Sequence, residues 1–296
     1  MTNQERSNKR RKKSNVVKRR QGNQDILIDK DDFKVINAIK FPNKRWKDRN
    51  LKYEVEGDDK RVSYLKISGI RLDDEIVSKI FTLTSLKKLH LIECLFDLSP
   101  SIGLLQNLEE LDISSSAIVQ IPKEIGNLAN LEALTMIDTR IEWGELPASI
   151  GNLKKLECLD IGSSDIAELP KEFWDLTSLR NLNALSLSIK IPPSIKRFKN
   201  LEILNVGIQG DLPEEIGTLT SLEEINIRKD SGSVKFPTSM VNLKELYHFE
   251  LEAEKFDFRQ LEFIKNLPKI ERVYVPGRWC DGKESFVQEF SLIEAA

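Results

Sequence analysis

One pattern recurs from about residue 62 to the end of the chain, with a period of 21 to 25 residues. Each copy has apolar residues at its first, fourth and sixth positions, as in Leu156-x-x-Leu159-x-Ile161. A second half follows, as in Leu146-Pro147-x-x-Ile150-Gly151-Asn152-Leu153. A fixed period of this length is typical of solenoids, in which one small structural unit is stacked many times.

The spacing within each copy predicts one short strand per turn. Two apolar residues two positions apart share one face of an extended chain, while their neighbours point to the other face. The proline that follows lacks an N–H and fixes φ, so it ends the strand before the chain returns beneath the next one. No turn can bury its own apolar face, so stacking must join these faces into one core under a parallel sheet.

About nine full turns and a fragment are expected, forming a solenoid over residues 62–275. The copies begin at Val62, Leu86, Leu108, Leu131, Leu156, Leu179, Leu201, Leu222, Leu246 and Ile270. The register near residues 179–191 stays open, because Leu182, Leu185 and Leu187 offer a second phase of the same spacing.

On these motifs the chain resembles the leucine-rich-repeat family, whose pattern is L-x-x-L-x-L-x-x-N/C-x-L. The Leu-Pro-x-x-Ile-Gly-Asn-Leu phrase is similar to that of plant intracellular Ras-group-related proteins and of microbial repeat proteins. The resemblance implies an α/β fold: a curved horseshoe with a parallel sheet on its concave face and short helices or turns on its convex side. It also implies a scaffold in intracellular signalling.

The family's usual Asn or Cys is mostly replaced here, so a continuous asparagine ladder is not expected. Only the middle turns keep a small hydrogen-bonding residue at that position: Cys94, Ser116, Thr139 and Ser164.

A solenoid needs caps over its apolar ends. We expect an N-terminal cap over residues 25–61, with Asp31 or Asp32 capping a short helix that ends before Pro42. A strand, a Gly/Asp turn and the first repeat strand should follow over residues 53–62. Residues 276–296 should form the C-terminal cap, with Phe286 and Phe290 able to fold over the last turn.

Residues 1–24 are expected to form a disordered basic tail. Residues 1–22 hold nine Lys/Arg against Glu5 alone, although the whole chain has a net charge of −2. Such a segment buries too little apolar surface to offset its ordering entropy. It could bind nucleic acid or direct the chain to a nucleus, or it could be a solvated tail. The residues concerned are Lys9, Arg10, Arg11, Lys12, Lys13, Lys18, Arg19 and Arg20.

The sequence favours a non-enzymatic protein without cofactor or metal. We find no Walker loop, GxGxxG, GxSxG or HExxH motif, and the two histidines, His90 and His248, lie about seven repeats apart. His90 takes an outward strand position, where we expect an exposed side chain. Three cysteines without CxxC spacing argue against a disulfide framework or a zinc site. Apolar runs are short and the N-terminus is charged, so we expect a monomeric cytoplasmic protein without a membrane span.

The outward strand positions predict a binding surface on the concave face. Acidic side chains there lie beside apolar ones, an arrangement typical of contact sites with anchors inside a charged rim. We hypothesise that this face binds a basic or amphipathic segment of another protein. Scattered apolar residues and carboxylates are also normal on protein surfaces, so that alternative stays open. The predicted site residues are His90, Ile92, Asp112, Ile137, Asp138, Asp160, Leu185, Ile203 and Asn205.

Overall fold

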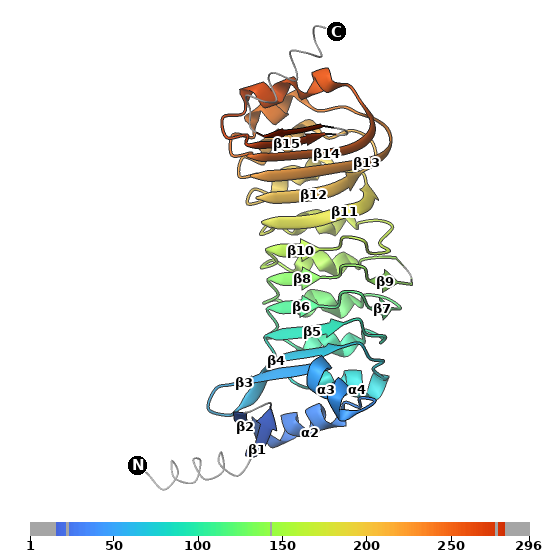
Figure 1. The fold of residues 1–296 in the computed structure, drawn as a ribbon, viewed down its shortest axis with the longest axis vertical. Coiled ribbons are helices and arrows are strands. Elements are labelled where there is room, and N and C mark those ends of the chain that lie inside the picture. The colour runs from blue at the N-terminus through green and yellow to red at the C-terminus, as the bar shows by residue number, and fades with distance from the viewer. Residues whose placement is uncertain (1–15, 22–23, 143, 276–277, 282–296) are drawn as a thin grey trace, which may run out of the picture.

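One twelve-stranded sheet runs the length of the computed structural model (Figure 1). The structure describes residues 16–21, 24–142, 144–275 and 278–281. The strands from β4 to β15 pair in parallel with their neighbours, while β3 and β16 close the two ends in antiparallel pairing. The strands are β3 (Leu51–Glu56), β4 (Arg61–Ser68), β5 (Lys88–Ile92), β6 (Glu110–Asp112), β8 (Ala133–Thr135), β10 (Cys158–Asp160), β11 (Asn181–Ile189), β12 (Ile203–Ile208), β13 (Glu224–Val234), β14 (His248–Phe256), β15 (Arg272–Val275) and β16 (Arg278–Asp281).

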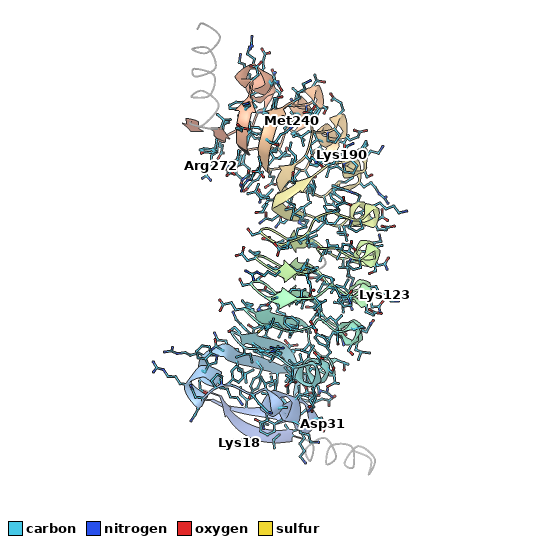
Figure 2. The ribbon with its side chains drawn as sticks, turned by 90° about the vertical axis from the view of Figure 1, so that its right-hand side faces the viewer. Lys18, Asp31, Lys123, Lys190, Met240 and Arg272 are labelled. Atoms are coloured by element: carbon cyan, nitrogen blue, oxygen red, sulfur yellow. The ribbon has the colours of Figure 1, made fainter. Side chains whose placement is uncertain are left out.

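Short helices cover the opposite side of the molecule, and the strand side is concave (Figure 2). In the first turn this helix is α4 (Asp74–Ile80), and 3-10 helices take its place afterwards. They are η1 (Pro100–Leu104), η2 (Lys123–Asn127), η3 (Ala148–Asn152), η4 (Lys171–Asp175), η5 (Pro193–Arg197), η6 (Glu214–Thr218), η7 (Thr238–Asn242) and η8 (Phe258–Asn266). The α/β horseshoe predicted from the repeats is therefore confirmed.

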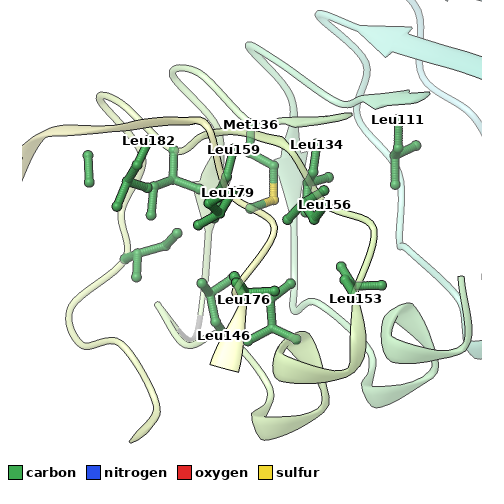
Figure 3. Packing of buried hydrophobic residues seen from close by; sticks show 14 of the residues in the cluster. Leu111, Leu134, Met136, Leu146, Leu153, Leu156, Leu159, Leu176, Leu179 and Leu182 are labelled. Carbon is green, nitrogen blue, oxygen red and sulfur yellow. The ribbon is translucent and has the colours of Figure 1, made fainter. Parts of the chain in front are cut away.

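The core is a stack of equivalent apolar positions from successive turns. Leu134, Leu159 and Leu182 lie side by side in β8, β10 and β11, and each is 1% exposed (Figure 3). The position two residues later, held by Met136 and Ile161, is fully buried as well. Full burial of such side chains stabilises a fold by about 1.5–3 kcal/mol each.

The glycine of the Ile-Gly-Asn-Leu phrase allows the 3-10 helices to stack closely. A Cβ on Gly126 would lie 2.4 Å from the carbonyl oxygen of Ser149 in the next turn. A Cβ on Gly217 would lie 2.3 Å from the carbonyl oxygen of Ser239. Real Cβ atoms do not approach an oxygen so closely, so the repeated glycine is a packing requirement.

Hydroxyl groups link the middle turns where the family has asparagine. The buried Ser116 Oγ donates to the Leu91 carbonyl at 2.9 Å and accepts from the Cys94 N–H at 3.1 Å. The Thr139 Oγ1 donates to the Ile113 carbonyl at 3.0 Å. The prediction that the middle turns keep a hydrogen-bonding residue here is confirmed for these two positions.

Strand pairing settles the register that the sequence left open. Asn183 of β11 pairs with Asp160 of β10 and Asn205 of β12. Leu182 and Ala184 therefore point into the core, and the chain follows the phase that starts at Leu179.

A second, narrow parallel sheet lies beside the main one and was not predicted. It consists of β7 (Ala117–Ile118) and β9 (Arg140–Ile141), with an isolated bridge from Leu95 to Ala117. Two-residue strands leave almost no alternating pattern in a sequence.

The N-terminal region differs from the predicted disordered tail. Residues Val16–Gln21 form β1, which pairs antiparallel with β2 (Gln24–Asp29). The prediction of disorder over residues 1–24 is therefore wrong for residues 16–21, and residues 1–15 lie outside the described part. Val17 packs against the core, which supplies apolar burial that the charge count did not weigh.

Two helices complete the N-terminal region, α2 (Lys30–Ala38) and α3 (Lys44–Asn50). The cap of α2 is Asp29, which accepts from the N–H groups of Asp31 and Asp32, so the predicted cap at Asp31 or Asp32 is wrong. Asp32 is instead 1% exposed and accepts from the Val62 N–H at 2.7 Å and from Arg61 Nη2 at 2.7 Å. This carboxylate ties α2 to the first repeat strand.

The solenoid ends at β15, against which β16 pairs in antiparallel fashion. Phe286 and Phe290, predicted to fold over the last turn, lie outside the described residues.

Candidate protein-interaction surface

The strand register aligns one outward residue from each turn, as the phasing of the repeats predicts. We call this row the central column. Each member is paired with the next across neighbouring strands. It runs Lys66, His90, Asp112, Thr135, Asp160, Asn183, Asn205, Asn226, Glu250 and Tyr274.

Four predicted site residues, His90, Asp112, Asp160 and Asn205, belong to this column. The others flank it. Ile203 starts β12 on one side, and Ile92 and Leu185 lie on the other side, with Ile137 and Asp138 just beyond the end of β8. The structure thus brings seven of the nine residues to one face of the sheet, and Ile137 and Asp138 follow at the end of β8.

The predicted exposure of the apolar residues is only partly correct. Ile137 is 37% exposed, whereas Ile92, Leu185 and Ile203 are half-buried between their neighbours on the sheet. Ile137 is therefore the most accessible apolar anchor among the predicted residues.

Asp112 and Asp160 also have a structural role, because each caps the end of its own strand. The Asp112 Oδ1 accepts from the Ser114 N–H at 2.9 Å, and the Asp160 Oδ1 accepts from the Gly162 N–H at 3.0 Å. Asn183 caps Leu185 in the same way at 3.3 Å. Aspartate and asparagine commonly make such local bonds, so the local backbone alone accounts for part of this column.

His90 is not the exposed side chain that its strand position predicts, since only 17% of it is accessible. Its Nε2 lies 2.6 Å from Glu110, which also binds Lys88 at 2.6 Å. The Tyr64 ring meets the imidazole edge-on, with centroids 5.3 Å apart. Burial raises the pKa of Glu110, but the hydrogen bonds from Lys88 and His90 outweigh it, so this pKa is lowered overall.

The C-terminal end of the column is satisfied only in part, because the buried Asn226 Oδ1 has no hydrogen-bond partner among the described residues. Asn226 donates to Glu250 at 3.0 Å, and neighbouring Arg228 pairs with Asp230 at 2.8 Å. Glu110 and Arg228 thus have partners of opposite charge, whereas no ion pair reaches Asp112 or Asp160 within the described residues. The middle of the concave face keeps its negative charge.

The described part of the chain includes only three of the basic residues expected to act together. Lys18, Arg19 and Arg20 belong to β1, and Lys9, Arg10, Arg11, Lys12 and Lys13 lie outside the described residues.

Within the ranges that the structure describes, no three or more His, Cys, Asp or Glu side chains gather as metal ligands would. No helix in the same ranges has the length and apolar character needed to cross a bilayer.

Comparison with solved structures finds the same fold in proteins of bacteria and plants. A leucine-rich-repeat protein of Leptospira interrogans is 29% identical with a TM-score of 0.57, over 68% of this chain and 53% of that one. The ectodomain of the Arabidopsis receptor kinase HAESA, solved with an extended IDA peptide hormone, is 22% identical with a TM-score of 0.56. That match covers 86% of this chain and 42% of the ectodomain.

An internalin of Listeria monocytogenes is 17% identical with a TM-score of 0.53, over 73% of this chain and 70% of its own length. The likenesses to the internalin and to HAESA show the fold alone. This chain spans about half the length of the Leptospira protein.

Comparison with curated proteins gives no match. The model of the leucine-rich repeat region, by contrast, matches residues 102–190 and 159–294, which together exceed half of the chain. These matches agree with the stacked turns and the long, mainly parallel sheet, and the chain belongs to the leucine-rich-repeat family.

Proposed function

We propose that this chain is a non-catalytic scaffold of intracellular signalling that binds a partner protein through its concave face. The observation that carries the proposal is the uncompensated pair Asp112 and Asp160 beside the exposed Ile137. Carboxylates without cations attract basic groups, and an accessible apolar side chain among them supplies an anchor. The partner is therefore a basic or amphipathic segment of a protein.

The comparisons support this direction without identifying the partner. The HAESA ectodomain is a leucine-rich-repeat structure solved with a bound peptide, so the fold can present a binding surface to a peptide. A cytoplasmic, monomeric protein is part of the proposal and rests on the cysteine content and the charge pattern of the sequence.

Protein capture from a lysate of the source organism tests the face. The wild type should retain a specific protein that the Asp112→Arg/Ile137→Glu variant loses, because that variant reverses one charge and removes the apolar anchor. Asp112→Asn, which can keep the strand cap, should weaken capture less. Circular dichroism checks that each variant is folded.

The matched control also replaces one acidic residue by arginine and one apolar residue by glutamate, but on the convex side. Leu104 is 54% exposed on η1, and Glu124 lies on η2, so Leu104→Glu/Glu124→Arg should bind as the wild type does. Loss of the partner in the control and the concave variant alike would show that the concave face has no special role. Deleting residues 1–15 separates capture by the basic segment from capture by the face.

A further inference from the structure

A hollow of about 330 Å³ opens on the concave face between β8, β10, β11 and β12. We call it the Asp160 pocket. Its polar lining includes Thr135, Asp160, Asn181, Asn183 and Asn205, and Ile203 forms an apolar wall. The core side chains Leu159 and Leu182 also contribute to its lining. The volume suits one long side chain, and no lysine or arginine lines it.

The Asp160 carboxylate lines this pocket and has no positively charged partner among the described residues. Its Oδ1 accepts from the Gly162 N–H at 3.0 Å, and its Oδ2 accepts from Asn183 Nδ2 at 3.1 Å. Both donors are neutral, and no cation pairs with Asp160 in the described residues. Each carboxylate oxygen can accept a second hydrogen bond, so the half-buried group retains capacity for a cationic donor.

Asn181 adds an acceptor that lacks a donor. Its Oδ1 is covered from solvent and accepts no hydrogen bond from any described residue, while its Nδ2 points to Cys158 Sγ at 3.7 Å. A covered acceptor without a donor is unfavourable, because it has lost its hydrogen bonds to water. The pocket therefore has acceptors with unused capacity on both β10, at Asp160, and β11, at Asn181.

We propose that the Asp160 pocket holds an arginine side chain of the partner protein. The inference rests on the proposed function and specifies the residue that this face recognises. A guanidinium presents five N–H donors in one plane, so it can donate to both Asp160 oxygens while its methylene stem packs against Ile203. The covered Asn181 Oδ1 becomes a further acceptor once rotation of that side chain turns it toward the pocket. An ammonium is a more strongly hydrated point charge, so lysine fits these spread acceptors less well.

Titration with N-acetyl-arginine methylamide tests the pocket directly. The side-chain NH2 signals of Asn181 and Asn183 should shift in NMR spectra as this probe binds. The corresponding citrulline derivative has the same shape without charge and should bind at least about tenfold more weakly, because it cannot make charge-assisted hydrogen bonds. Equal binding of both probes, or no shift at either asparagine, would overturn the proposal.

Asp160→Asn is the decisive variant. Asparagine already occupies this column in the next three strands, and its Oδ1 can still cap Gly162, so the fold should persist. Affinity for the arginine probe should fall by about tenfold or more. The control Asp165→Asn removes an equal charge from an exposed position on the same turn and should leave binding unchanged. If both variants lowered the affinity for the arginine probe equally, the effect would come from the net charge of the protein, and the pocket would be contradicted.

The pocket and the wider function can fail separately. If the arginine probe does not bind but the Asp112→Arg/Ile137→Glu variant still loses its captured protein, the pocket is wrong and the interaction face stands. If the probe binds as expected while that variant loses nothing, the pocket stands and the extended face is wrong.

Discussion

At the residue scale, the hydroxyl of Ser116 replaces the asparagine that the family uses between turns. Ser116→Ala would leave the buried Cys94 N–H and the Leu91 carbonyl without this partner. We expect a loss of about 1–3 kcal/mol in the free energy of unfolding, measured by urea denaturation. Ser116→Thr should cost less, because Thr139 already makes the equivalent bond in the next turn. If Ser116→Ala left the free energy of unfolding unchanged, the hydroxyl bonds between turns would not contribute to stability.

The two described free cysteines should differ in reactivity. Burial raises the pKa of Cys94 to about 11, and burial also raises the pKa of the partly exposed Cys158. Since the thiolate is the nucleophile, Cys94 should resist iodoacetamide at about pH 8 until the protein unfolds, and Cys158 should react first. In a Cys280→Ser variant, mass spectrometry can measure the labelling of Cys94 and of Cys158 separately. Equal labelling would show that the first turns open readily.

Asp32 predicts a pH dependence of the N-terminal region. Burial raises the pKa of Asp32 from its ordinary value of 3.8, and the bonds from Val62 and Arg61 oppose this only in part. Folding therefore favours the protonated carboxyl. That contribution is complete below the ordinary pKa and is lost as the pH rises through the raised value.

Urea denaturation of the wild type and Asp32→Asn between about pH 3 and pH 7 checks this sign. The stability of the wild type relative to the variant should fall as the pH rises. A relative stability that grew with pH would mean that the ion pair with Arg61 outweighs burial.

At the element scale, the glycine in η1, η2, η3 and η6 fixes how closely these 3-10 helices stack on the next turn. In Gly217→Ala the new Cβ would meet the Ser239 carbonyl at 2.3 Å, and overpacking of this kind costs about 1–3 kcal/mol. A lower melting temperature is therefore expected. Val241 holds the equivalent position in η7 and already has a side chain, so Val241→Ala should be milder. Equal effects would show that the helices can move apart without loss.

Strands that belong to the repeat were predictable from the sequence. Elements whose sequence signal consists of only one or two residues were not. The spacing of Leu156, Leu159 and Ile161 identified a strand because inward and outward positions alternate. The same spacing also aligned the central column correctly. The strand β7 was missed, since two residues form no pattern. The hairpin of β1 and β2 was missed because the many basic residues of this segment predicted disorder, and the apolar Val16 and Val17 were given too little weight.

The candidate surface shows the same division. The sequence placed Asp112 and Asp160 on one face, because their positions follow from the period. It did not show that both carboxylates cap their own strands, or that His90 would be covered by Tyr64 and Glu110. Those contacts depend on side-chain directions and on neighbouring strands, which the repeat phase does not specify.

At the scale of the whole molecule, each turn contacts mainly the turns before and after it, and antiparallel strands close both ends. Stability in such an array is close to a sum of turn and interface contributions. The uncompensated charge lies in the middle, where β8 and β10 are also the shortest strands of the main sheet with β6. In the proposed binding region, backbone bonds between turns continue past the strand ends, as from the Met136 N–H to the Asp160 carbonyl at 2.8 Å, and the core beneath them joins the same turns.

Truncation of one central core residue should therefore open the solenoid locally. Leu159 is 1% exposed between Leu134 and Leu182, and Leu→Ala in a core costs about 2–5 kcal/mol. Hydrogen exchange followed by mass spectrometry should show faster exchange in β8, β10 and β11 of Leu159→Ala, while β4 and β14 stay as protected as in the wild type. The arginine probe should lose affinity in this variant, because its acceptors on β10 and β11 are no longer held in place. Uniformly faster exchange from β4 to β14 would instead mean that the stack unfolds as one cooperative unit, in which case the binding face is stabilised by every turn and not only by those beneath it.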